Sequence, residues 1–195
     1  MIYSNGWNLS VIPDSLYLFY KDEHVRLPLI KKIEVNINDS IAVCQMDSGG
    51  YRFLNLATMG FIGDTYNFAW HFSEGLAAVE IDENIGFINK RGKIMIEPQY
   101  PSENWQREDH YRIAFHDGKA AVTDDIKYYN LIDKKAQWQW DDYCFPYVKW
   151  YGVGMIVKQR YQEGNWVYTN SEGIINGAFD SEISDVLAYP DDKSL

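Results

Sequence analysis

The chain has 195 residues, a formal net charge of −10, and 46% hydrophobic and 24% charged residues. This composition is typical of a soluble globular protein and argues against a disordered chain. Basic side chains form no stripe, so we expect no nucleic-acid partner. No apolar stretch approaches about 18 residues, so we also expect no membrane-spanning helix and no membrane partner.

The aromatic content is high, with 7 Trp, 15 Tyr and 9 Phe, and this favours β structure with aromatic contact surfaces. The N-terminal residues lack a basic segment followed by an apolar run, so they predict no signal peptide. The two cysteines, Cys44 and Cys144, form no CxxC pair. We therefore expect a cytoplasmic protein whose thiols are reduced.

Short strands are predicted along most of the chain. Residues 16–20 and 25–30 predict two strands of an atypical leading unit, as is common at the end of a repeat array. Four apolar segments then recur, at residues 41–46, 76–81, 119–124 and 154–159. Each is followed by a second strand in which large apolar residues alternate with others, and this period of two indicates a half-buried strand.

Each alternating strand ends at an Asx residue, and these residues are spaced by 34, 44 and 37 positions: Asn55, Asn89, Asp133 and Asn170. An Asx side chain at the first position of a type I turn accepts a hydrogen bond from the backbone two residues on. Glycine at the fourth position, as at Gly92 and Gly173, tolerates a positive φ. Thr58 and Ala136 stand there in the other copies, so we expect those turns to differ or to carry strain.

A returning strand should follow each turn. Ile94 and Ile96 alternate after Asn89, and we expect both to face inward. Trp138 and Trp140 stand at the equivalent places after Asp133. These two tryptophans fit either the core or a binding surface.

Residues 72–100, "FSEGLAAVEIDENIGFINKRGKIMIEPQY", resemble one WG repeat, also named a KWG repeat. The family pattern runs Phe-x-x-Gly-Leu-Ala-x-Val, then Trp-Gly-Tyr-Ile-Asp-x-x-Gly-Lys, then Ile-x-Pro-x-Tyr. The Trp-Gly pair is intact nowhere in the chain, because Ile85-Gly86 keeps only the glycine and Trp166-Val167 keeps only the tryptophan. The resemblance implies tandem β-hairpins and implies no activity.

The predicted fold is all-β, with tandem antiparallel hairpins stacked as a short array or solenoid-like sheet, because one unit alone cannot bury its apolar face. Closure into a propeller or a barrel is left open, since hairpin repetition does not set the curvature. We expect one β-repeat domain over residues 1–195. Its parts are a leading unit at 1–35, repeat units at about 36–71, 72–114, 115–149 and 150–180, and an acidic tail or short helix at 181–195.

The sequence offers no motif of a catalytic site. His110 and His116 lie near carboxylates but lack the three or four converging ligands of a zinc site. Cys44 lies in an apolar strand, and Cys144 is flanked by acids, which raise a thiol pKa. We therefore expect no catalytic residue, no metal and no cofactor.

The most unusual stretch is "QWQWDDYCFPYVKWYGVGM" at residues 137–155, in which aromatic residues are interleaved with acids. Such a mixture fits a binding rim. The candidate partner-binding residues in it are Trp140, Asp141, Asp142, Tyr143, Tyr147, Trp150 and Tyr151.

These features predict a non-catalytic protein-binding repeat protein. A sharper hypothesis is an immunity protein that neutralises a cognate bacterial toxin, because an acidic chain suits a basic toxin domain and complementary charge speeds capture. The alternative is a module that binds carbohydrate or another small ligand on Trp and Tyr platforms. An enzyme with a carboxylate or histidine pair in a cleft is the third hypothesis.

Overall fold

The computed structural model describes residues 7–12, 15–20, 23–27, 29–35, 40–102, 113–123, 129–139, 147–151, 154–158, 166–169 and 175–179. Side chains are described for residues 29–35, 40–102, 113–123 and 129–139. The chain divides into two compact units, Met1–Pro98 and Gln99–Leu195. The expected tail or helix at 181–195 lies outside the described residues.

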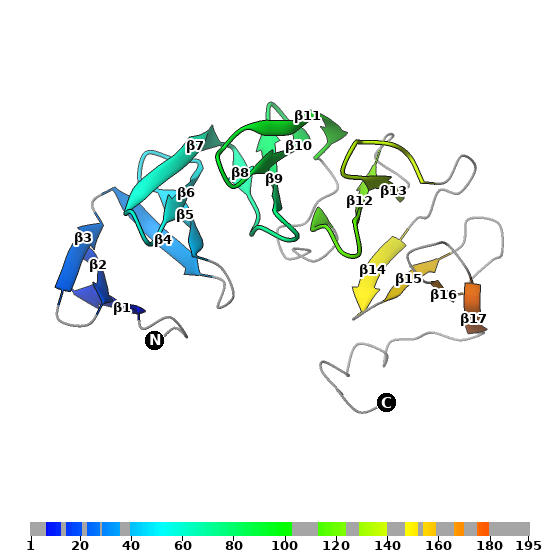
Figure 1. Cartoon of the computed structure of the whole chain (residues 1–195), viewed down its shortest axis with the longest axis horizontal. Helices are drawn as coiled ribbons and strands as arrows, with labels where there is room; N and C mark the ends of the chain where they lie inside the picture. Colours follow the sequence, from blue (N-terminus) through cyan, green and yellow to red (C-terminus); the bar gives the residue numbers. More distant parts are fainter. Residues whose placement is uncertain are drawn as a thin grey trace. The chain divides into compact units, whose positions relative to one another are not determined.

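Among its described residues, the first unit contains three antiparallel sheets, in each of which neighbouring strands follow one another along the chain (Figure 1). The first sheet has three strands, β1 (Trp7–Ile12), β2 (Ser15–Tyr20) and β3 (Glu23–Leu27). The second has four strands, β4 (Ile30–Val35), β5 (Ile41–Met46), β6 (Tyr51–Asn55) and β7 (Gly60–Tyr66). The third also has four, β8 (Phe68–Ala69), β9 (Leu76–Ile81), β10 (Asn84–Asn89) and β11 (Ile94–Pro101), the last of which reaches into the second unit.

The second unit contains two further antiparallel sheets among its described residues. One is the pair β12 (Lys119–Thr123) and β13 (Tyr129–Asp133). The other has four strands in chain order, β14 (Tyr147–Tyr151), β15 (Gly154–Lys158), β16 (Trp166–Thr169) and β17 (Ile175–Phe179).

The all-β prediction is therefore confirmed, and the apolar segments predicted at 41–46 and 76–81 are the strands β5 and β9. In the described part of the chain, backbone hydrogen bonds join the strands into separate sheets of two to four strands each. The first strands of the second and third sheets, β4 and β8, lie at the ends of the units expected at 1–35 and 36–71. These two sheets therefore begin a few residues before the expected units at 36 and 72. Over the same described residues, no helix has the length and hydropathy of a membrane span.

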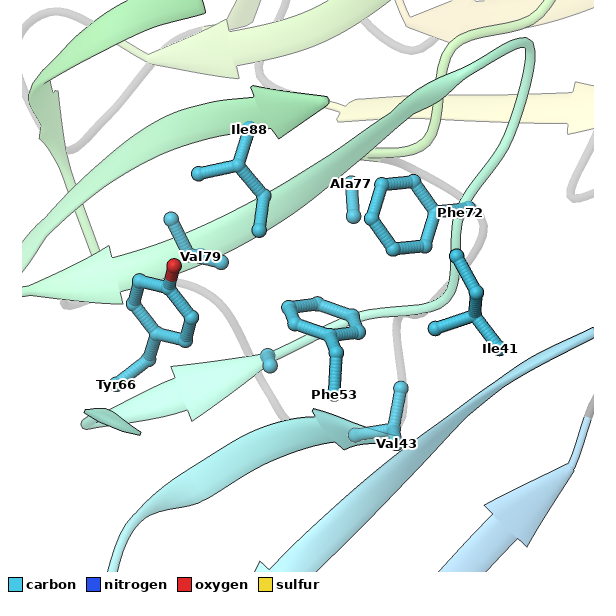
Figure 2. Close-up of a cluster of buried hydrophobic side chains, with 9 residues drawn as sticks. Ile41, Val43, Phe53, Tyr66, Phe72, Ala77, Val79 and Ile88 are labelled. Atoms are coloured by element: carbon cyan, nitrogen blue, oxygen red, sulfur yellow. The ribbon is translucent and has the colours of Figure 1, made fainter. Parts of the chain in front are cut away.

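A buried cluster between the second and third sheets forms a core of the first unit (Figure 2). Phe53 on β6 is fully buried, and its ring centroid lies 4.9 Å from that of Phe72 and 6.0 Å from that of Tyr66. The third sheet supplies Val79 and Ile88 to the same cluster. These two sheets thus share one apolar core, although they are separate in their hydrogen bonding.

The opposite face of the second sheet is also buried. Its residues form a separate apolar cluster that consists of Ile30, Ile33, Ala42, Cys44, Met46, Leu54 and Leu56. Because both faces of this sheet are covered, β5 carries an almost continuous apolar run instead of a strict alternation.

The outer strand of the third sheet approaches its neighbour closely. A Cβ atom placed on Gly86 of β10 would lie 2.8 Å from both the Ile96 carbonyl oxygen and the Pro98 nitrogen of β11. Proline lacks a backbone N–H and is therefore tolerated in an edge strand such as β11. Gly86, which has no side chain, thus leaves room for Pro98 on the neighbouring strand.

Candidate partner-binding surface

The structure describes only the backbone of part of the predicted binding patch. Trp140, Asp141, Asp142 and Tyr143 lie outside the described residues. Tyr147, Trp150 and Tyr151 lie on β14, which pairs with β15. The patch therefore stays a prediction.

The predicted Asx turns at Asn89 and Asp133 have the expected hydrogen bonds. Asn89 Oδ1 accepts from the backbone N–H groups of Arg91 and Lys93, at 2.9 and 3.1 Å. Asp133 Oδ1 accepts from the two equivalent N–H groups, those of Lys135 and Gln137, at 2.8 and 2.9 Å. The same turn therefore occurs in both copies.

Asn55 forms a different turn, in which its Oδ1 accepts from the N–H groups of Ala57 and Thr58 at 2.9 and 3.1 Å. The other predicted turn residues, Asn170 and Gly173, lie outside the described part of the chain.

The two copies that lack the turn glycine place the positive φ at different positions of the turn. Gly92 has a φ of 78°, and Ala136 adopts nearly the same conformation with a φ of 62°. An L-residue in this left-handed region costs about 1 kcal/mol or more. In the copy that begins at Asn55, the positive φ moves to Met59, at 56°, and Thr58 avoids it. Both altered turns therefore carry a strained residue, and the turn at Asn55 also differs in where that residue stands.

An acidic turn between β9 and β10 also carries backbone strain. Asp82 and Glu83 are exposed and have φ values of 47° and 63°, in a two-residue turn that usually contains asparagine or glycine. Asn67 Oδ1 accepts from the Asp82 N–H at 3.2 Å, and Asn84 Nδ2 donates to the Asp82 carbonyl oxygen at 2.9 Å. These contacts hold the backbone of Asp82, so the turn presents two exposed acidic residues at one end of the third sheet.

The prediction that Ile94 faces inward is wrong. Ile96 is buried, but the Ile94 side chain is 37% exposed. Trp138, at the equivalent place after Asp133, is 40% exposed, and its ring meets the buried Tyr100 ring edge-on at 5.7 Å. Alternation assigns Ile94 and Ile96 to one face of β11, but Ile94 lies at the start of the strand, next to the turn, where the face ends.

Sequence reasoning missed an exposed aromatic contact on the second sheet. The Arg52 guanidinium lies 4.2 Å from the centre of the Phe61 ring, which is 39% exposed. The pairing of β6 with β7 shifts between Tyr51 and Phe53, and Arg52 lies at that irregularity. Arg52 replaces the glycine that stands at Gly86 in the next copy, and this departure from the repeat was the available signal.

The described side chains give little support to a chemical role. Cys44 is fully buried, and burial raises the pKa of its thiol from 9.0 to about 12, so it is protonated at neutral pH. His116 lies in a tight turn in which its backbone N–H donates to the Lys119 carbonyl oxygen at 2.8 Å. His110 and Cys144 lie outside the described residues. Within the described ranges, no three His, Cys, Asp or Glu side chains are grouped so that they could hold a metal ion.

The fold is similar to that of solved β-propeller structures. A Kluyveromyces lactis Hsv2 chain with loop 6CD replaced by a Gly-Ser linker aligns at a TM-score of 0.54 and 7% identity, covering 94% of this chain and 66% of that one. The structure of Kluyveromyces lactis Hsv2p aligns at a TM-score of 0.53 and 9% identity, covering 92% of this chain and 62% of that one. This chain thus spans less than two thirds of the length of those chains. At such low identity the likeness shows the fold alone, that of a propeller-like all-β protein.

Two segments identify the repeat itself. Residues 65–84 and 85–102 match the model of the WG containing repeat, and the resemblance of this region to the WG family is confirmed. Together the two matches cover the whole third sheet, from β8 to β11. None of the curated proteins compared matches the chain in sequence.

Proposed function

We propose that this chain is a cytoplasmic, non-catalytic repeat protein that binds another protein, and that its partner is a basic toxin domain that it neutralises. The observation that carries the proposal is the exposed turn of Asp82 and Glu83. Both residues hold a positive φ where glycine would be less strained. Strained residues persist where the surrounding structure holds them in place, and they are frequent at binding sites.

The charge of the chain supports the same partner. A formal net charge of −10 attracts a basic protein over distances of about a Debye length, roughly 8 Å at physiological ionic strength. Complementary charge raises the rate of association and suppresses binding of the wrong partner. Two exposed carboxylates on a rigid turn suit a basic surface better than carboxylates on a mobile loop, since less order is lost on binding.

Co-expression with the product of the adjacent gene in the native genome tests the proposal. The wild-type protein should form a stable one-to-one complex in size-exclusion chromatography with light scattering, and it should protect cells from that product. The double variant Asp82→Asn/Glu83→Gln should weaken the complex about tenfold and slow its association.

Glu74→Gln is the matched control for the double variant. Glu74 is also exposed and has a positive φ of 49°, but it lies in the tight turn that precedes β9, at the other end of this strand. This control should bind as the wild type does. If the wild-type protein neither binds nor protects, the proposed function is refuted.

A further inference from the structure

Large apolar side chains that are exposed occur mainly at two adjacent positions of the repeat. Of the five such side chains among the described residues, four follow an Asx turn residue by five or six positions. These four are Phe61 after Asn55, Ile94 and Met95 after Asn89, and Trp138 after Asp133. Single exposed apolar residues are ordinary in proteins, but recurrence at equivalent places of a repeat is not explained by chance exposure.

The scaffold does not require an apolar residue at the first of these positions. The residue five positions after the turn is Gly60 in one copy, Ile94 in the next and Trp138 in the third, and all three are exposed. Since glycine suffices in the first copy, the larger residues are not needed to complete the strand. Repeat proteins commonly use variable residues at equivalent surface positions to bind partners.

The Asn89 turn is held against the second sheet. A Cβ atom placed on Gly92 would lie 2.6 Å from the Gly63 Cα and 3.3 Å from the Ile62 Cγ2. The turn that precedes Ile94 therefore packs against β7 at Ile62 and Gly63, whereas Phe61, which pairs with Leu54, belongs to the other face of the second sheet. Met95 is held at the same turn, because Asn89 Nδ2 lies 3.3 Å from its Sδ.

Basic side chains stand next to these apolar residues, although the chain as a whole is acidic. The Arg52 guanidinium lies over the Phe61 ring. The turn just before Ile94 carries three exposed basic residues, Lys90, Arg91 and Lys93.

The basic groups are concentrated at the turn end of these strands. On β11 the nearest exposed acid, Glu97, lies three residues farther along from Ile94, and on β7 the exposed Asp64 follows Gly63, which contacts the turn. In the second unit, exposed Lys134 and Lys135 likewise precede Trp138. A partner that covers the turn end must therefore supply apolar side chains together with carboxylates.

We propose that the first unit binds an extended acidic peptide segment with apolar side chains, on a surface formed by Ile94 and Met95 together with Lys90 and Arg91. Apolar side chains of the peptide cover the exposed residues at the start of β11, and its carboxylates pair with the guanidinium and ammonium groups beside them. This surface is opposite in sign to the Asp82–Glu83 turn, so the inference is independent of the proposed function.

Fluorescence anisotropy with the full chain tests this proposal. The probe is a labelled synthetic peptide of twelve residues in which Glu or Asp alternates with Leu or Phe. We expect saturable one-to-one binding that weakens as salt is added, because exposed charges are screened. A peptide with Lys in place of each acid, and one with Ser in place of each apolar residue, should both bind at least about tenfold more weakly.

Two pairs of variants locate the site. Ile94→Ser/Met95→Ser and Lys90→Glu/Arg91→Glu should each weaken binding about tenfold. Leu29→Asn and Lys31→Glu are the matched controls, because Leu29 and Lys31 are both exposed and both lie away from the Asx turns. Circular dichroism and thermal unfolding establish that each variant is folded.

The proposal is overturned if the wild-type chain shows no saturation by about 1 mM peptide, or if the lysine peptide binds as tightly as the acidic one. It is also overturned if the folded variants at residues 90–95 bind like the wild type, or if Leu29→Asn weakens binding as much as they do.

Discussion

At the scale of single residues, three Asx side chains organise turns in the described part of the chain. Asn89 and Asp133 each accept two backbone N–H groups through one oxygen, so the turn needs no help from residues distant in sequence. The backbone then requires a left-handed residue, which Gly92 supplies without cost and Ala136 supplies with strain. A repeat can therefore lose its glycine and keep its turn when the Asx residue is present.

Replacing the strained alanine should stabilise the protein. Ala136→Gly removes the left-handed strain but increases the freedom of the unfolded chain, and the balance is an expected gain of about 0.5–1 kcal/mol in the free energy of unfolding. Urea unfolding followed by circular dichroism measures it. Ala57→Gly, in an exposed turn without a positive φ at that residue, should instead lose about 0.5–1 kcal/mol. A loss of stability in Ala136→Gly would contradict the strain argument.

The sequence predicted these turns because their chemistry is local, and it failed where a position depends on a neighbouring strand or sheet. Alternation placed Ile94 and Ile96 on one face of the strand. It does not say how much of that face is covered by packed residues, and Ile94 lies outside the covered part. Arg52 and Phe61 meet across an irregularity in strand pairing, which no local pattern predicts. The aromatic stretch 137–155 was chosen by composition alone, and its role as a binding surface stays a prediction.

At the scale of the element, the third sheet explains why its repeat contains a glycine and a proline. Pro98 can occupy β11 because β11 is an edge strand, and its nitrogen approaches β10 at the point where Gly86 has no side chain. The equivalent place in the second sheet is Arg52, and there the pairing of β6 with β7 becomes irregular. Where glycine stands at this position, the outer strand pairs closely with its neighbour. Where glycine is replaced, the pairing is irregular.

Gly86→Ala should consequently disturb the third sheet. The added methyl would lie 2.8 Å from two backbone atoms of β11, so the strand must move, and overpacking of this kind costs about 1–3 kcal/mol. Gly60→Ala is the control, since its Cβ would meet only Thr58 Oγ1, at 3.4 Å, and its stability should change by less than about 1 kcal/mol. Chemical denaturation compares the two variants. Equal effects of both substitutions would refute the role given to Gly86.

At the scale of the whole molecule, the described sheets depend on packing between their faces. Both faces of the second sheet are buried along its inner strands β5 and β6, and one of these faces shares its core with the third sheet. The repetition of hairpins predicted that units must stack, because a single unit leaves an apolar face uncovered. It did not predict that the strands would form separate hydrogen-bonded sheets. The pattern of apolar residues along a strand is the same whether the strands form separate sheets or one continuous sheet.

Removal of Phe53 tests whether the second and third sheets unfold as one. This side chain is fully buried and touches both Phe72 and Tyr66 in the shared core, so Phe53→Ala should cost about 3–5 kcal/mol. Phe61→Ala, at an exposed side chain, should cost less than about 1 kcal/mol. Hydrogen exchange read by mass spectrometry distinguishes the cooperative case, because the amides of β5–β6 and β9–β10 should lose protection together and by a similar free energy. Loss of protection in β5–β6 alone would mean that each sheet is a separate cooperative unit, and that the shared core joins the two sheets without coupling their stability.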